Sequence, residues 1–175
     1  PKLESLLGKF PCKGYSIFTG GFYNLSQSDD CASIIDNNAL YEDSIIHELV
    51  YPYMKNIEFP LELSWLKYGF AEYVAREMRN SWDLFDRIYK VFYDTDIPAS
   101  KINADTHDGE WALYALMGGA RILRQIDFGD TGEERIENLW NVIKSLGPNP
   151  TLENAVKALS AYALSDFLEE SIIGK

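Results

Sequence analysis

The helical spacing of apolar side chains from about residue 40 to the end of the chain constrains the fold more than any other feature. This spacing predicts helices over about 41–54, 62–78, 82–92, 108–126 and 131–145, and two shorter ones after 151 and 165. The side chains placed to cap these helices are Ser81, Thr131 (with Glu134 as a capping box), Thr151 and Ser165. Pro52 should kink or end the first helix, and the Gly-Pro-Asn-Pro sequence at 147–150 predicts a firm break.

The first 40 residues lack the helical pattern and predict extended or irregular structure. Tyr15 to Phe18 alternates as a short strand does, and the segment from Cys31 to Ile35 predicts a second strand. We therefore expect an α+β fold that is mostly α, with short N-terminal strands in 1–40 followed by a helical bundle in 41–175. The whole of 1–175 is expected to be one domain. Because it starts at Pro1 without a methionine, we expect a piece of a longer chain.

Composition excludes several classes of function. The net charge of −11 argues against nucleic acid and anionic membranes as partners, because both require a basic surface. No apolar run approaches the ~20 residues of a membrane-spanning helix, and no signal-peptide pattern opens the chain, so a soluble protein is expected. The spacing of Cys12 and Cys31 matches no zinc or redox motif, which leaves either a disulfide or two free thiols.

The segment from Ser44 to Tyr51 reads S-I-I-H-E-L-V-Y and is close to the H-E-x-x-H helix of zinc peptidases. In that motif two imidazoles one turn apart bind the metal and the glutamate acts as general base. His47 stands at the first ligand position and Glu48 at the base, but Tyr51 replaces the second imidazole. By itself, His47 is more simply explained as a hydrogen-bonded core histidine.

A second segment strengthens the similarity to zinc peptidases. Residues 65–73 read W-L-K-Y-G-F-A-E-Y. This resembles the aminopeptidase N-like gluzincins, whose matching helix reads close to W-L-N-E-G-F-A-E-Y. The family's third zinc ligand, a glutamate, falls on Tyr68. The resemblance implies a thermolysin-like, gluzincin-type metallopeptidase domain.

Weaker similarities follow in the family's order, from about residue 10 to 173. The sequence G-G-F-Y-N at 20–24 resembles the family's substrate-binding loop, with Gly20, Gly21 and Asn24 kept and Tyr23 in place of a glutamate. The helix at 114–123 resembles the helix that supplies a catalytic tyrosine. In that alignment Leu116 takes the tyrosine position and Tyr114 lies two residues away. The segment Ser165–Leu168 resembles the start of the family's closing helix.

The departures from the family fall on functional positions, which are Tyr23, Tyr51 and Tyr68. A neutral phenol with a pKa of ~10 is a poor zinc ligand at neutral pH. We therefore expect no cofactor and no catalysis, and instead a peptidase-like domain for binding or scaffolding. Its partner would be a peptide or protein in an aromatic cleft between the 41–54 and 62–78 helices.

Two alternatives stay open. In the first, the chain is an active metal-dependent peptidase in which zinc is held by His47, Glu72 and His107, with Glu48 as general base. Glu72 is more simply a framework carboxylate one turn after Tyr68, and His107 more simply part of a polar helix start. In the second, the domain is a structural part of a longer assembly and only packs.

Overall fold

The computed structural model describes residues 2–20, 27–29, 31–36, 42–89, 97–102 and 111–174. The strands are β1 (Ser16–Gly20), β2 (Gln27–Asp29) and β3 (Ala32–Asp36). The helices are α1 (Lys2–Leu7), α2 (Glu42–Val50), α3 (Ser64–Arg79), α4 (Trp82–Tyr89), α6 (Trp111–Arg124), α7 (Gly132–Ser145), α8 (Leu152–Leu159) and α9 (Ser165–Leu168). Shorter helical turns cover Tyr51–Met54, Leu61–Leu63, Ala99–Lys101 and Glu169–Ile173. The prediction of a mostly helical fold with a small N-terminal sheet is confirmed.

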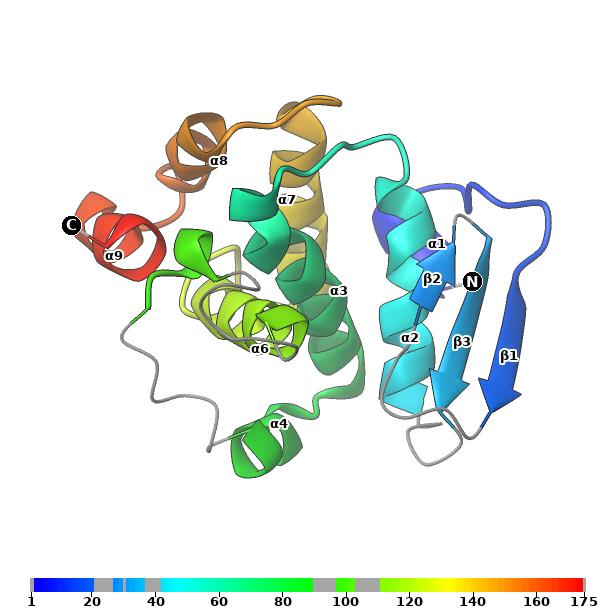
Figure 1. Cartoon of the computed structure of the whole chain (residues 1–175). Helices are drawn as coiled ribbons and strands as arrows, with labels where there is room; N and C mark the ends of the chain where they lie inside the picture. Colours follow the sequence, from blue (N-terminus) through cyan, green and yellow to red (C-terminus); the bar gives the residue numbers. More distant parts are fainter. Residues whose placement is uncertain are drawn as a thin grey trace.

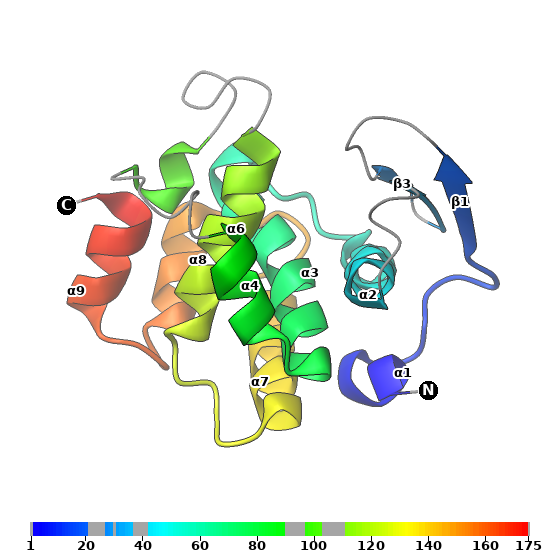
Figure 2. The same ribbon diagram turned by 90° about the horizontal axis from the view of Figure 1, so that it is seen from below.

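The sheet has the order β1-β3-β2, with β1 parallel and β2 antiparallel to β3. In β3, Ser33 and Ile35 are buried, while Ile34 is exposed opposite Phe18 of β1. One face of the sheet therefore packs inward, and α2 lies between the sheet and α3 (Figures 1 and 2). Alternation does not predict β2, because its Gln-Ser-Asp sequence has no apolar residue.

The N-terminal helix α1 corrects the expectation that residues 1–40 contain only extended or irregular structure. Leu6 and Leu7 are buried, and α1 packs against α7. The indole nitrogen of Trp140 also donates a hydrogen bond of 2.9 Å to the carbonyl oxygen of Leu7. A six-residue helix is unstable alone, so tertiary contacts stabilise it rather than its own periodicity.

The centre of the fold is α3, which crosses α6 at a pair of glycines. A Cβ atom added to Gly69 would lie 2.5 Å from the backbone carbon of Gly119. A Cβ atom on Gly119 would overlap the carbonyl oxygen of Trp65. The two helix backbones are therefore in direct contact, which fixes α3 relative to α6.

The predicted helix ends are mostly close to those observed, with informative exceptions. The hydroxyl of Thr131 accepts a hydrogen bond from the amide of Glu134, but the Glu134 carboxylate accepts from Asp130 instead of closing the capping box. Thr151 caps α8 through the amide of Asn154. The prediction that Ser165 caps the last helix is wrong, because Leu164 occupies the N-cap without a side-chain bond. The predicted ends at 92 and 108 lie outside the described residues.

The structure joins Cys12 and Cys31 by a disulfide, with a Cα–Cα distance of 5.7 Å. It ties the segment after α1 to the start of β3. We expect reduction to lower the free energy of unfolding by about 3 kcal/mol, since the closed loop restricts the unfolded chain. Urea denaturation with and without reductant measures this change. The Cys12→Ser/Cys31→Ser variant, which should not respond to reductant, is the control, and equal midpoints for oxidised and reduced protein would contradict the prediction.

Among the described residues, no helix is both long enough and apolar enough to cross a membrane.

Candidate functional site

The site lies where α2 meets α3, and its centre is the buried imidazole of His47. Nδ1 of His47 lies 3.0 Å from Oε2 of Glu72, and Nε2 lies 2.8 Å from the hydroxyl oxygen of Tyr51. A neutral imidazole has one donor and one acceptor nitrogen. Because a carboxylate only accepts, Nδ1–H donates to Glu72, and in the neutral imidazole Nε2 then accepts from the Tyr51 hydroxyl. Both ring nitrogens are therefore already in use.

Glu72 is held on both of its oxygens. It is 5% exposed, and its Oε1 accepts a hydrogen bond of 2.7 Å from Nε of Arg76, one turn further along α3. Burial alone would raise the pKa of Glu72, but the hydrogen bond from His47 and the charge of Arg76 together hold it below its ordinary value. Glu72 therefore stays ionised although it is buried.

Arg76 extends this chain back to α2 and on to the start of α4. Its guanidinium contacts the carboxylate of Asp43, which also accepts a hydrogen bond of 2.8 Å from Ser81. We call this set the buried polar chain; in order it contains Tyr51, His47, Glu72, Arg76, Asp43 and Ser81. It connects residues on α2, on α3 and immediately before α4, so its bonds fix these elements relative to one another.

At the Tyr51 end of the buried polar chain, two further aromatic rings follow. The rings of Tyr51 and Tyr68 meet edge to face at 6.2 Å between centroids, and those of Tyr68 and Trp111 at 6.0 Å. We call these three residues the aromatic row. Burial, followed by the charge of Glu48, raises the pKa of Tyr51, and burial raises that of Tyr68. Both phenols are therefore protonated at neutral pH.

Glu48 lies next to His47 on α2 and is 2% exposed. Its backbone carbonyl accepts a hydrogen bond of 3.1 Å from the hydroxyl of Tyr15. Its negative charge raises the pKa of both Tyr15 and Tyr51, so the carboxylate is within electrostatic reach of the two phenols.

The donor set does not fit a catalytic zinc ion. Zinc requires about three good ligands and one open position. The three positions that match the family's ligands are close together, but they supply one imidazole, His47, and two protonated phenols, Tyr51 and Tyr68. The hydroxyl of Tyr51 occupies the Nε2 direction that a metal would need. In the part of the chain that the structure describes, no group of three His, Cys, Asp or Glu residues is arranged to hold a metal ion.

Of the altered ligand set, the structure describes only His47 and Glu72. Glu72 contacts Nδ1 of His47, whereas Nε2 points to Tyr51, so Glu72 and Nε2 do not face one metal position. His107 lies outside the described residues, as do Gly21, Tyr23 and Asn24.

The remaining predicted residues lie on two elements. Gly20 ends β1. Tyr114 is partly buried on α6, one turn after Trp111, and Leu116 of the same helix packs against the core.

The sequence did not indicate that Arg76, Asp43 and Trp111 belong to the site, and it indicated Ser81 only as a helix cap. The four-residue spacing of Glu72 and Arg76 on one helix was a usable signal for their pairing. Asp43 lies 33 residues before Arg76, and no local pattern connects the two.

Comparison of the chain with protein-family models, with curated proteins and with solved structures found no significant match. The gluzincin relationship therefore rests on the sequence motifs and stays a prediction.

Proposed function

We propose that this chain is a gluzincin-like domain that binds no catalytic zinc and acts as a binding or scaffold domain. The observation that carries the proposal is the hydrogen bond between the Tyr51 hydroxyl and Nε2 of His47. The Tyr51 hydroxyl therefore lies where a metal ion bound to Nε2 of His47 would be. Without a metal, Glu48 has no activated water from which to take a proton.

The buried polar chain gives these residues a structural role in place of catalysis. In a zinc peptidase the metal joins the two helices that supply its ligands. Here the bonds from His47 to Glu72 and from Arg76 to Asp43 join α2 to α3 without a metal. Buried polar groups that are fully hydrogen-bonded favour one arrangement of the elements they connect. The geometry therefore supports a domain that keeps the helix arrangement after losing the zinc.

The aromatic row supports a peptide or protein as the partner. Tyr68 and Trp111 are partly exposed, and Nζ of Lys67 lies 5.6 Å from the centroid of the Tyr68 ring. Aromatic side chains with one buried and one accessible edge are enriched where proteins bind partners. An acidic chain with these rings suits a basic or amphipathic peptide.

We do not adopt the alternative of an active peptidase with a ligand set of His47, Glu72 and His107. It requires the Glu72 carboxylate to leave both the His47 ring and the Arg76 guanidinium. That change would break the buried hydrogen bond between His47 and Glu72 and leave Asp43 as the remaining carboxylate partner of Arg76.

Restoring the family's ligands tests the proposal. We expect Tyr51→His/Tyr68→Glu to bind one zinc ion per chain at least about 100-fold more tightly than the wild type, because it supplies three strong ligands. Competition with a fluorescent zinc chelator measures both affinities. Adding His47→Ala to the restored variant is the matched control and should abolish the gain.

Two outcomes would contradict the proposal. If the wild type binds zinc as tightly as the restored variant, the tyrosines do not block the site. If the restored variant is folded by circular dichroism but gains no zinc, positions 47, 51 and 68 are not arranged as the gluzincin resemblance requires.

A further inference from the structure

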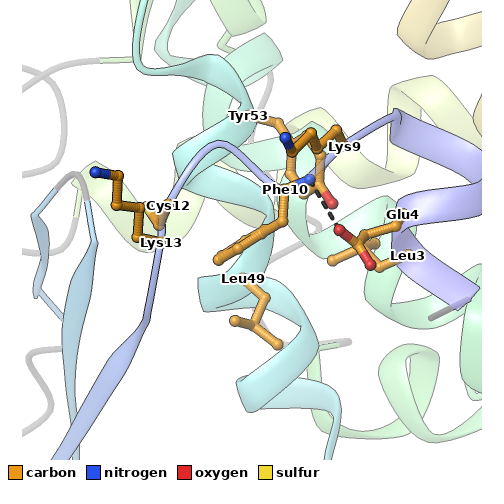
Figure 3. A pocket seen from close by; sticks show the side chains of 8 residues that line it. All are labelled: Leu3, Glu4, Lys9, Phe10, Cys12, Lys13, Leu49 and Tyr53. Atoms are coloured by element: carbon orange, nitrogen blue, oxygen red, sulfur yellow. Dashed lines mark hydrogen bonds between the residues drawn. The ribbon is translucent and has the colours of Figure 1, made fainter.

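A groove of about 520 Å³ opens on the side of α2 away from the buried polar chain. Its residues come from α1, from the segment after it and from α2 with the following turn; they are Leu3, Glu4, Lys9, Phe10, Cys12, Lys13, Leu49 and Tyr53 (Figure 3). This volume is within the range of small-molecule sites. Leu49 is two residues from His47, which places the two side chains on opposite sides of the helix. The groove is therefore separate from the site described above.

The floor of the groove is apolar and aromatic. The rings of Phe10 and Tyr53 meet edge to face at 5.5 Å, and Leu3 and Leu49 complete the surface. Figure 3 shows Phe10, Tyr53 and Leu49 gathered in the middle, with Lys13 at one end and Leu3 at the other. Such a surface suits the hydrocarbon body of a ligand.

One polar group on this floor lacks a partner. The hydroxyl oxygen of Tyr53 is buried and has no hydrogen-bond partner within the described part of the chain. Burial, with the charge of Glu4, raises the pKa of Tyr53 to about 12, so the hydroxyl remains a donor at neutral pH. A buried donor without an acceptor is unfavourable, and a ligand oxygen would satisfy it.

The rim of the groove is cationic on a strongly acidic chain. Lys9 and Lys13 are both exposed, and neither forms a salt bridge with a carboxylate of the described residues. The carboxylate of Glu4 is engaged locally, since its Oε1 accepts a hydrogen bond of 3.1 Å from the amide of Phe10. Two cations beside an apolar floor are complementary to an anion with an apolar body.

We propose that this groove binds a small organic carboxylate with an apolar body, of the medium-chain fatty acid type. The carboxylate lies on the Lys9 side of the groove, where it accepts a hydrogen bond from the Tyr53 hydroxyl, and Lys13 at one end of the groove adds positive charge. The hydrocarbon body covers Phe10 and Leu49. The disulfide from Cys12 to β3 holds the lysine-bearing segment in place, which reduces the entropy lost on binding.

The test uses the oxidised full chain and decanoate, with decanol as the uncharged counterpart, each kept below its aggregation threshold. Amide NMR spectra locate the binding and give its affinity. We expect shifts at Phe10, Leu49 and Tyr53, and an affinity for decanoate at least about tenfold above that for decanol. Lys9→Gln/Lys13→Gln should lower the decanoate affinity about tenfold or more. The charge-matched control Lys55→Gln/Lys157→Gln, at two exposed lysines that do not line the groove, should leave it unchanged.

Three results would overturn the proposal. The first is equal binding of decanoate and decanol, and the second is unchanged decanoate binding in Lys9→Gln/Lys13→Gln. The third is a set of shifts that omits the groove, including the absence of any shift. Tyr51→His/Tyr68→Glu should bind decanoate as the wild type does, so this test is independent of the zinc proposal.

Discussion

Gly119→Ala is expected to prevent stable folding, with the free energy of unfolding lowered by about 4 kcal/mol or more. The added methyl group would overlap the carbonyl oxygen of Trp65, and neither backbone can move aside without separating α3 from α6. Backbone atoms have no alternative rotamer, so the strain is not relieved locally. Urea denaturation followed by far-ultraviolet circular dichroism measures the loss.

The preceding glycine is the matched control. A Cβ atom on Gly118 would meet only a side-chain atom of Ile102, at an ordinary contact distance of 3.6 Å. Alanine is favoured over glycine inside a helix, so Gly118→Ala should raise the free energy of unfolding by roughly 0.5–1 kcal/mol. Similar stabilities for the two variants would show that the helices do not cross at Gly119.

Arg76→Ala is expected to lower the free energy of unfolding by about 3–5 kcal/mol. The guanidinium is the cation that the buried carboxylate of Glu72 and the partly buried carboxylate of Asp43 share. Its removal leaves two negative charges in a site with little access to water. Chemical denaturation at neutral pH measures the effect.

The stability of Arg76→Ala relative to the wild type should also depend on pH. The pKa of Glu72 in the folded protein is lowered, so its contribution to stability is present above its unfolded pKa of about 4.3 and lost as pH falls through the lower folded value. Once Glu72 and Asp43 are protonated they carry no negative charge, so Arg76 stabilises them less. The stability difference between wild type and Arg76→Ala should therefore narrow as the pH falls below about 4.

Arg79→Ala is the matched control on the same helix. Its side chain is 45% exposed and contacts Glu42 and Asp43, whereas that of Arg76 is 7% exposed. An exposed salt bridge contributes less than about 1 kcal/mol, so this variant should be close to wild type. Equal losses for the two arginine variants would mean that the buried polar chain does not stabilise the fold.

Local patterns in the sequence predicted much of the helical part of the fold. Thr131 and Thr151 carry capping side chains, and Pro52 follows the end of α2, so these boundaries are encoded near the helix ends. The helix α1 and the strand β2 were missed because tertiary contacts and strand pairing determine them. The Cys12–Cys31 disulfide depends on how close the two residues lie in the folded chain, which their spacing in the sequence does not determine.

The candidate site was predictable only in part. The four-residue spacing of His47 and Tyr51 placed them on one side of a helix, and the structure brings them within hydrogen-bond distance. That Glu72 faces Nδ1 of His47 depends on how α2 packs against α3, which no pattern within either helix determines. The groove on the opposite side of α2 combines two stretches far apart in the sequence, 3–13 and 49–53, and no local sequence pattern predicted it.

The most direct test is the metal content of the purified wild-type protein, measured by mass spectrometry after exposure to equimolar zinc and desalting. We expect a stoichiometry near zero, because the Tyr51 hydroxyl occupies Nε2 of His47 and both tyrosines are protonated. A stoichiometry near one zinc ion per chain, abolished by His47→Ala, would contradict the proposal of a zinc-free domain.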